Sequence, residues 1–154
     1  MPRHAERRVS AFTPEQLFDL VVDVERYPEF LPWCLGAAIT AQHEDGFEAD
    51  LAIGFRLLRA SYRSRITHHR PTRIDVKLVR GPFRHLVNHW RFEQVDGLKT
   101  EIDFEVDFEF RSTVFSKAMS PLFGVAVQRM VHEFERRAQR LYSGTPEARA
   151  KVIG

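Results

Sequence analysis

The sequence predicts an α+β fold, in which a curved antiparallel β-sheet of six to seven strands wraps around a long C-terminal α-helix and a short helical pair follows the first strand. Three features predict this architecture. A helix-start signal lies at Thr13–Gln16, apolar and polar residues alternate over about Phe47–Phe110, and helical spacing returns over Phe115–Tyr142. Strands with one apolar and one polar face form antiparallel sheets, and the apolar face must be buried against another element.

The composition indicates a globular chain with one core. The chain has 154 residues, of which 44% are hydrophobic and 29% are charged, and its formal net charge is +2. This near balance of charge excludes a polycation. Thirteen Phe stand beside three Tyr and two Trp, so the aromatic content suits an apolar core or cavity. The lone Cys34 excludes an internal disulfide framework and favours a reducing compartment.

Targeting signals are not evident in the sequence. No run approaches the roughly 18–20 apolar residues of a membrane-spanning helix, and Met1–Arg8 lacks the apolar centre of a secretory signal. We therefore expect a cytoplasmic, monomeric protein that could also lie peripherally at the inner membrane. One domain is expected over residues 1–142, followed by a disordered tail at 143–154.

The first helix has a strong start signal. Thr13 can cap it, Pro14 suits the first helical position, and Gln16 can complete a capping box. The prolines Pro28 and Pro32 are predicted to end this helix. The apolar segment that they bracket, from Tyr27 to Cys34, is predicted to be a short turn or broken helix.

Five successive segments alternate with period two and predict a meander of strands. The breaks between them carry the turn pairs Asp45-Gly46, Arg70-Pro71, Gly81-Pro82 and Asp96-Gly97. The predicted strands are Phe47–Phe55, Arg59–Ile66, Ile74–Leu78, Leu86–Glu93 and Ile102–Phe110.

The C-terminal helix is predicted to run over Phe115–Tyr142, about 40 Å at 1.5 Å per residue. Pro121 predicts a kink in it, or a restart with Ser120 as the cap. A sheet curled around this helix leaves a space unless side chains fill it, so the chain encloses either an apolar ligand cavity or a filled core. The residues predicted to line the cavity are Phe55, Tyr62, Asn88, Trp90, Phe92, Phe104, Phe108, Phe115, Met119, Phe123 and Met130.

Few polar groups are predicted to face this interior. Asn88 is the only asparagine, and it could donate a hydrogen bond to a ligand carbonyl or bond instead to backbone or Tyr62. The alternating carboxylates of Asp103–Glu109 point outward, which leaves little material for general acid–base catalysis. The spacing of the histidines does not suit one metal ion. We therefore predict no catalytic residue, no metal and no cofactor.

Three motifs carry a resemblance to a known family. Tyr27–Cys34 (YPEFLPWC), Gly81–Phe92 (GPFRHLVNHWRF) and Phe115–Ala138 are similar to motifs of the START-like (helix-grip, Bet v 1-like) superfamily. Within it they resemble the coenzyme Q-binding branch, which also includes ribosome-association toxin (RatA) proteins and proteins labelled polyketide cyclase/dehydrase. The resemblance covers about residues 3–142. It implies a non-enzymatic protein that holds a polyprenyl quinone or another lipid between sheet and helix.

Two surfaces are candidates for contact with a partner. The side chains of the Tyr27–Cys34 segment either form a mouth that touches a membrane or plug the end of the sheet; they are Tyr27, Phe30, Leu31 and Trp33. A basic face could bind anionic lipid or ribosomal RNA, or simply be solvated beside an acidic strand flanked by the N-terminal basic strand; its residues are Arg59, Arg63, Arg65 and Lys77.

We therefore predict a protein that chaperones or presents a hydrophobic ligand, ubiquinone or a related polyprenyl lipid, in support of respiratory electron transport. Ubiquinone would be a bound ligand, not a catalytic cofactor. One alternative is a ribosome-associating, toxin-like factor that blocks subunit association through the basic face. A second alternative is an enzyme like the polyketide cyclases.

Overall fold

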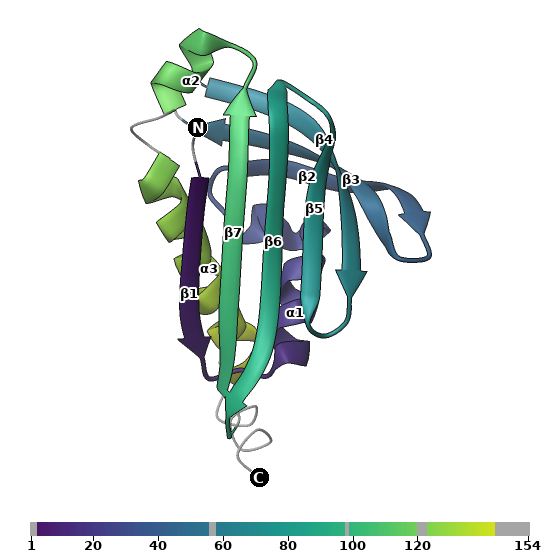
Figure 1. Cartoon of the computed structure of the whole chain (residues 1–154), viewed down its shortest axis with the longest axis vertical. Helices are drawn as coiled ribbons and strands as arrows, with labels where there is room; N and C mark the ends of the chain where they lie inside the picture. The colour runs from purple at the N-terminus through teal and green to yellow at the C-terminus, as the bar shows by residue number, and fades with distance from the viewer. Residues whose placement is uncertain (1–2, 56–57, 98, 120–122, 144–154) are drawn as a thin grey trace.

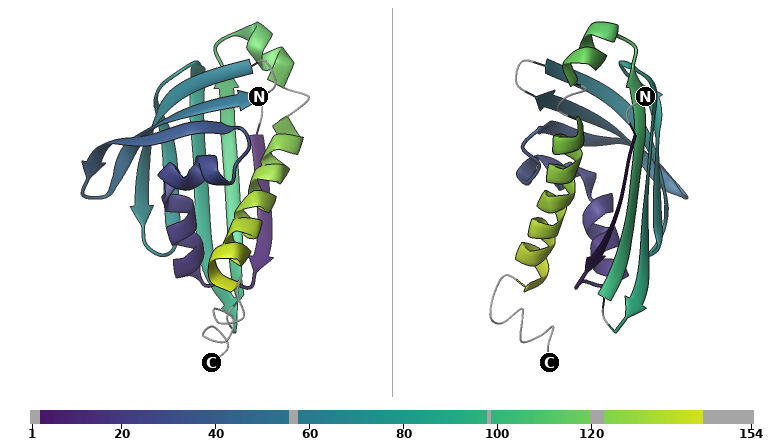
Figure 2. Two further views of the ribbon diagram at one scale, coloured as in Figure 1. Left: turned by 180° about the vertical axis from the view of Figure 1, so that it is seen from behind. Right: turned by 60° about the vertical axis from the view of Figure 1, so that its left-hand side comes forward.

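The computed structural model describes residues 3–55, 58–97, 99–119 and 123–143 (Figure 1). Within these residues, one antiparallel sheet of seven strands carries its helices on one face (Figure 2). This confirms the predicted α+β class. The elements in chain order are β1 (Arg3–Ser10), α1 (Pro14–Val22), the 3-10 helix η1 (Val24–Glu29), β2 (Cys34–His43), β3 (Gly46–Phe55), β4 (Leu58–His69), β5 (Arg73–Arg80), β6 (Phe83–Asp96), β7 (Lys99–Phe110), α2 (Thr113–Met119) and α3 (Phe123–Ser143).

The strand order is β1-β7-β6-β5-β4-β3-β2. The first two strands of the chain, β1 and β2, therefore lie at opposite edges of the sheet. Helices α1 and η1 make the connection between these edges across the concave face (Figure 2). From β2 onward each strand pairs with the next, which confirms the meander. Strand β2 is not among the five segments predicted, because its small residues at Gly36–Ala38 and Ala41 blur the alternation.

Helix α1 begins as predicted. The Thr13 Oγ1 accepts a hydrogen bond from the Gln16 backbone N–H at 3.2 Å, and the Gln16 Oε1 accepts one from the Thr13 N–H at 3.0 Å. The end of the helix differs from the prediction. It ends at Val22 because Asp23 leaves the helical conformation, and Pro28 lies inside η1.

Strand β1 pairs with β7 at the edge of the sheet, and ion pairs accompany this backbone pairing. The Arg3 guanidinium lies 2.6 Å from the Glu105 carboxylate, and that of Arg7 lies 2.8 Å from Asp103. The acidic outer face of β7 therefore lies beside the basic edge strand β1. This is the interpretation in which the N-terminal basic strand flanks the acidic strand. On the inner side, Arg8 donates to Glu135 of α3 at 2.9 Å and so ties the sheet to the helix.

The structure describes two helices in the C-terminal region, which agrees with the restart given as one of the two outcomes at Pro121 and not with one continuous helix over Phe115–Tyr142. Helix α2 ends at Met119 and α3 begins at Phe123, and Pro121 lies between them, outside the described residues. The predicted Ser120 cap and the tail at 144–154 lie outside the described residues, while Ser143 is the last residue of α3. At 1.5 Å per residue, the 21 residues of α3 span about 32 Å.

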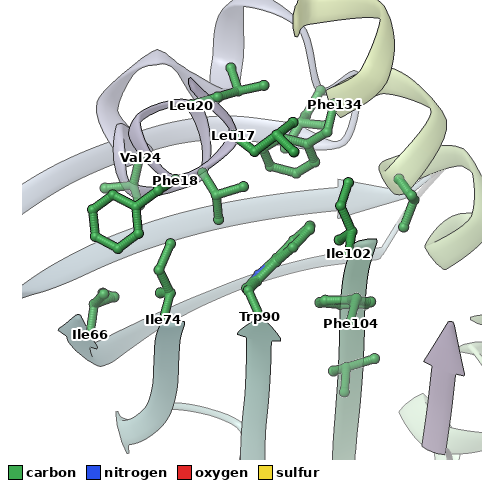
Figure 3. Close-up of a cluster of buried hydrophobic side chains, with 14 of the residues drawn as sticks. Leu17, Phe18, Leu20, Val24, Ile66, Ile74, Trp90, Ile102, Phe104 and Phe134 are labelled. Carbon is green, nitrogen blue, oxygen red and sulfur yellow. The ribbon is translucent and has the colours of Figure 1, made fainter. Parts of the chain in front are cut away.

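The α1 end of the sheet is filled with side chains. Helix α1 lays an apolar face on the inner residues of the sheet, beside α3 (Figure 3). Each of these side chains is at most 5% exposed: Leu17, Phe18 and Leu20 from α1, Phe92 from β6, Ile102 from β7, and Val131 and Ala138 from α3. This packing fixes α3 over the sheet.

Candidate functional site

A cavity of about 240 Å³ lies between the inner face of the sheet and the helices. Strands β2 to β7 line one side of it, and the end of α1, η1, the following turn, α2 and α3 line the other. Among the residues that the structure describes, no charged side chain lines this space. The inner residues alternate with outer polar ones in each strand, so the alternation in the sequence is what makes the wall apolar.

Most of the predicted lining residues face this cavity. They come from β4, β6, β7, α2 and α3, and they are Tyr62, Asn88, Trp90, Phe104, Phe108, Phe115 and Met130. The prediction was wrong for Phe92, which lies outside the cavity in the filled core at 2% exposure. The side chains of Phe55, Met119 and Phe123 lie outside the described residues.

The Tyr27–Cys34 segment is folded inward. The Leu31 backbone N–H donates to the Tyr27 carbonyl at 2.8 Å, and the Cys34 N–H donates to the Leu31 carbonyl at 3.0 Å. Leu31 is consequently 3% exposed, which rules out contact between this side chain and a membrane as the segment lies. Tyr27, Leu31 and Trp33 line the cavity, whereas Phe30 does not.

Three aromatic rings anchor this segment to α3. Tyr27, Phe30 and Phe134 pack edge to face, with ring centroids 5.2 to 5.9 Å apart. The Arg137 guanidinium lies 5.2 Å from the Phe30 ring centroid and donates to Glu29 at 2.9 Å. This packing agrees with the second of the two interpretations, in which the segment plugs the end of the sheet. We call Tyr27–Cys34 the plug segment; its Tyr27 and Trp33 form part of the cavity wall.

Polar groups are few in the cavity, and they are neutral. Burial raises the pKa of Tyr62 and of Tyr27, whose hydroxyl donates to the Val21 carbonyl. Burial also raises the pKa of the Cys34 thiol, which donates to the Gly36 carbonyl. The thiol therefore stays protonated near neutral pH, which is unfavourable for a nucleophile.

Two further polar groups in the wall were harder to assess from the sequence. Ser64 and Asn88 line the cavity, and neither the Ser64 Oγ nor the Asn88 Oδ1 has a hydrogen-bond partner among the described residues. Sequence alternation places both inward but gives no information on their partners. Ser64 is absent from the predicted cavity lining, although it lines the cavity in the structure.

The basic face is partly neutralised. Arg63 donates twice to Asp50, at 2.6 and 3.0 Å, and Arg65 donates to Asp45 at 2.6 Å. These hydrogen bonds lower the pKa of both carboxyls. Arg59 and Lys77 are exposed, with no carboxylate partner in the described part of the chain. The face is therefore less cationic than the sequence of β4 alone predicts.

Comparison with known proteins identifies the family. Residues 10–135 match the family described as polyketide cyclase / dehydrase and lipid transport. The chain belongs to this family. Within the START-like superfamily it falls in the branch of RatA and COQ10 proteins. It is 33% identical to ribosome association toxin RatA of Rickettsia prowazekii, over 87% of this chain and 94% of that protein. It is 35% identical to coenzyme Q-binding protein COQ10 homolog B, mitochondrial, of Xenopus laevis, over 90% of this chain and 59% of that protein.

Solved structures of START-like proteins share the fold. The solution structure of an 18 kDa protein from Caulobacter crescentus is 36% identical, with a TM-score of 0.74 over 92% of this chain and 98% of that chain. The Zhui aromatase/cyclase of Streptomyces sp. R1128 reaches a TM-score of 0.80 over 93% and 97% of the two chains. At 14% identity, the cyclase shares the START-like fold alone with this chain. No helix described here is long and apolar enough to cross a membrane.

Proposed function

We propose that this protein binds a polyprenyl quinone such as ubiquinone, with the ring in the cavity, and presents it to respiratory machinery at a membrane. The observation that carries the proposal is an uncharged, aromatic-rich cavity beneath α3. Apolar pockets with a few polar groups suit such ligands. The COQ10 relative, which its name describes as a coenzyme Q-binding protein, supports the choice of a quinone.

The cavity volume limits what enters. A cavity of about 150 Å³ lined by apolar side chains holds one benzene molecule. At about 240 Å³, this cavity admits a substituted ring and the start of a tail, not a long isoprenoid. The rest of the tail would therefore lie outside the cavity and contribute about 25 cal/mol per Å² wherever apolar surface covers it.

The lining favours a binding protein over an enzyme. General acid–base catalysis requires a positioned carboxylate, histidine or similar group, and the described lining offers no charged or imidazole side chain. Cys34 is held as a neutral thiol by burial. The likeness to an aromatase/cyclase is a likeness of fold alone. It therefore identifies no residue of this chain that would catalyse a cyclase reaction.

A surface beside the cavity suits contact with an anionic membrane. Val114 of α2 is 79% exposed and Val125 of α3 is 60% exposed, and each adjoins a cavity-lining residue in the sequence. Lys117 and Arg129 lie on the same two helices and are exposed. Neither α2 nor the first ten residues of α3 contains an acidic residue. We call Val114, Lys117, Val125 and Arg129 the mouth surface; cations beside exposed apolar groups favour anionic lipid.

Binding is tested directly with delipidated protein. Calorimetric titration with decylubiquinone is expected to give saturable one-to-one binding, and organic extraction of freshly purified protein is expected to release a quinone detectable by mass spectrometry. Trp90→Ala or Phe104→Ala should weaken binding about tenfold or more, because each removes a large apolar surface from the cavity. Leu141→Ala, at an exposed position on α3, is the control. Folded cavity variants that bind like the wild type would refute the site.

A second candidate function rests on the bacterial relatives. The match to RatA of Pseudomonas aeruginosa, named a ribosome association toxin, covers 99% of that protein at 33% identity. A factor of this kind would comigrate with ribosomal subunits in a sucrose gradient, in a salt-sensitive manner. Arg59→Glu with Lys77→Glu would abolish comigration, because these exposed cations, unlike Arg63 and Arg65, form no ion pair with any described residue. Salt-insensitive or absent comigration would exclude this function.

A further inference from the structure

Two buried oxygen atoms in the cavity wall lack hydrogen-bond partners. The Ser64 side chain belongs to a residue that is 1% exposed, and its Oγ has no partner among the described residues. The Asn88 Oδ1 is likewise buried and unpaired. A buried polar atom that lost its water and gained no partner destabilises the folded protein. In an otherwise apolar wall, such a pair calls for an explanation.

These two groups cannot serve as partners for each other. Asn88 on β6 is paired in the sheet with Val76 on β5, whereas Ser64 on β4 is paired with Leu78 on β5. Strand β5 therefore separates them, and two strand spacings amount to about 10 Å. They lie too far apart to bond to each other. Both line the same cavity, with Val76 between them also contributing to its wall.

We infer that Ser64 and Asn88 are the polar anchors of the ligand ring, and that the ligand class is a ring with hydrogen-bonding oxygens at opposite positions. This inference rests on the proposed function, since it assigns polar contacts within the same cavity. A ring lying over Val76 would direct one oxygen toward β4 and the other toward β6. A serine hydroxyl and a carboxamide each both donate and accept. The pair therefore complements the carbonyls of a quinone and the hydroxyls of its reduced form.

The inference predicts opposite effects on binding and on stability. Ser64→Ala and Asn88→Leu replace the polar groups with apolar ones of similar size. Each should leave the urea midpoint of the ligand-free protein unchanged or raised, because an unpaired buried group is removed. Each should also weaken ligand binding. If the Ser64 and Asn88 side chains stabilised the fold instead, their replacement would lower the urea midpoint of the ligand-free protein.

The experiment compares two probes with the same shape. Decylubiquinone and an analogue in which hydrogen replaces both quinone oxygens are titrated into wild type, Ser64→Ala, Asn88→Leu and the double variant. Wild type is expected to prefer decylubiquinone by about tenfold, the gain from two hydrogen bonds of ordinary net strength. The double variant should bind both probes equally. Val76→Ala is the control, expected to weaken both probes alike and preserve the preference.

The outcomes separate this inference from the proposed function. A wild type that binds neither probe refutes the quinone-binding function. A wild type that binds both probes equally, or a double variant that keeps the preference, overturns the assignment of Ser64 and Asn88 while leaving ring binding intact. A urea midpoint lowered even in the conservative Ser64→Ala variant assigns that hydroxyl to the fold and overturns its role as an anchor.

Discussion

At the α1 end of the sheet, Phe92 and Ile102 are covered by Leu17 and its neighbours and by Ala138 of α3, and little space remains. At the α2 end, Tyr62 and Phe108 stand on the same face of the same sheet and line a cavity. Both regions follow the same alternation of apolar and polar residues. The difference lies in what covers the face. Helices α1 and α3 cover it together at one end, whereas the Tyr27–Cys34 plug segment, α2 and the first half of α3 cover it at the other.

This contrast separates stability from binding within one sheet. The filled end buries its side chains completely and fixes α3 through residues such as Val131. The hollow end then needs little packing of its own, so its wall can expose apolar surface and two unpaired polar groups to a ligand. Phe134 lies at the boundary, since its ring packs against Trp90 in the sheet and against Tyr27 and Phe30 of the Tyr27–Cys34 plug segment.

The largest expected effect comes from deleting a ring at the filled end. Phe92→Ala should lower the free energy of unfolding by about 3–5 kcal/mol, because the ring is fully buried and leaves a void. Phe108→Ala should lower the free energy of unfolding clearly less, because it removes a half-buried ring that already borders the cavity. Urea titrations measure both. Equal losses at the two positions would mean that the α2 end is packed as tightly as the α1 end.

The sequence predicted more of the sheet than of the space beneath it. The capping box at Thr13, the parity of Asn88 and the break near Pro121 depend on neighbours in the chain, so local patterns reveal them. The inward fold of Leu31 and the pairing of Arg63 with Asp50 depend on tertiary contacts and strand register. A hollow interior depends on how far helices stand from the sheet, which periodicity does not encode.

Enlarging an alanine on α3 sharpens the comparison, because this helix covers both regions. Ala138 is 0% exposed at the filled end, whereas Ala126 lines the cavity. Ala138→Leu should lower the free energy of unfolding by about 1–3 kcal/mol through overpacking. Ala126→Leu should leave it nearly unchanged and weaken decylubiquinone binding, since the new side chain occupies cavity volume. Urea titration and calorimetry distinguish the two; loss of stability in both variants would contradict a hollow α2 end.

The mouth surface on α2 and α3 should contact a membrane, whereas the exposed surface of β5 and β6 should not. Val114→Glu and Val125→Glu are each expected to reduce binding to vesicles containing anionic lipid by about tenfold, since each removes an apolar contact and adds repulsion. Val79→Glu and Val95→Glu, on β5 and β6, introduce the same change at exposed positions away from the mouth surface. Cosedimentation with vesicles measures all four. Equal losses at every position would indicate a general charge effect, without a specific mouth surface.

The smallest effect concerns the junction between the plug segment and α3. Hydrogen bonds from Arg26 and Arg137 hold the pKa of Glu29 below its ordinary value. A carboxyl with a lowered folded-state pKa stabilises the protein above its unfolded-state pKa, about 4.3, and this contribution is lost as pH falls through the folded-state value. The difference in unfolding free energy between wild type and Glu29→Gln should therefore be small and constant above about pH 5 and shrink in more acidic solution. Urea titrations from pH 3 to 7 measure it. Because Arg137 also lies against Phe30, an additional loss of decylubiquinone binding in Glu29→Gln would show that this junction helps to set the shape of the cavity.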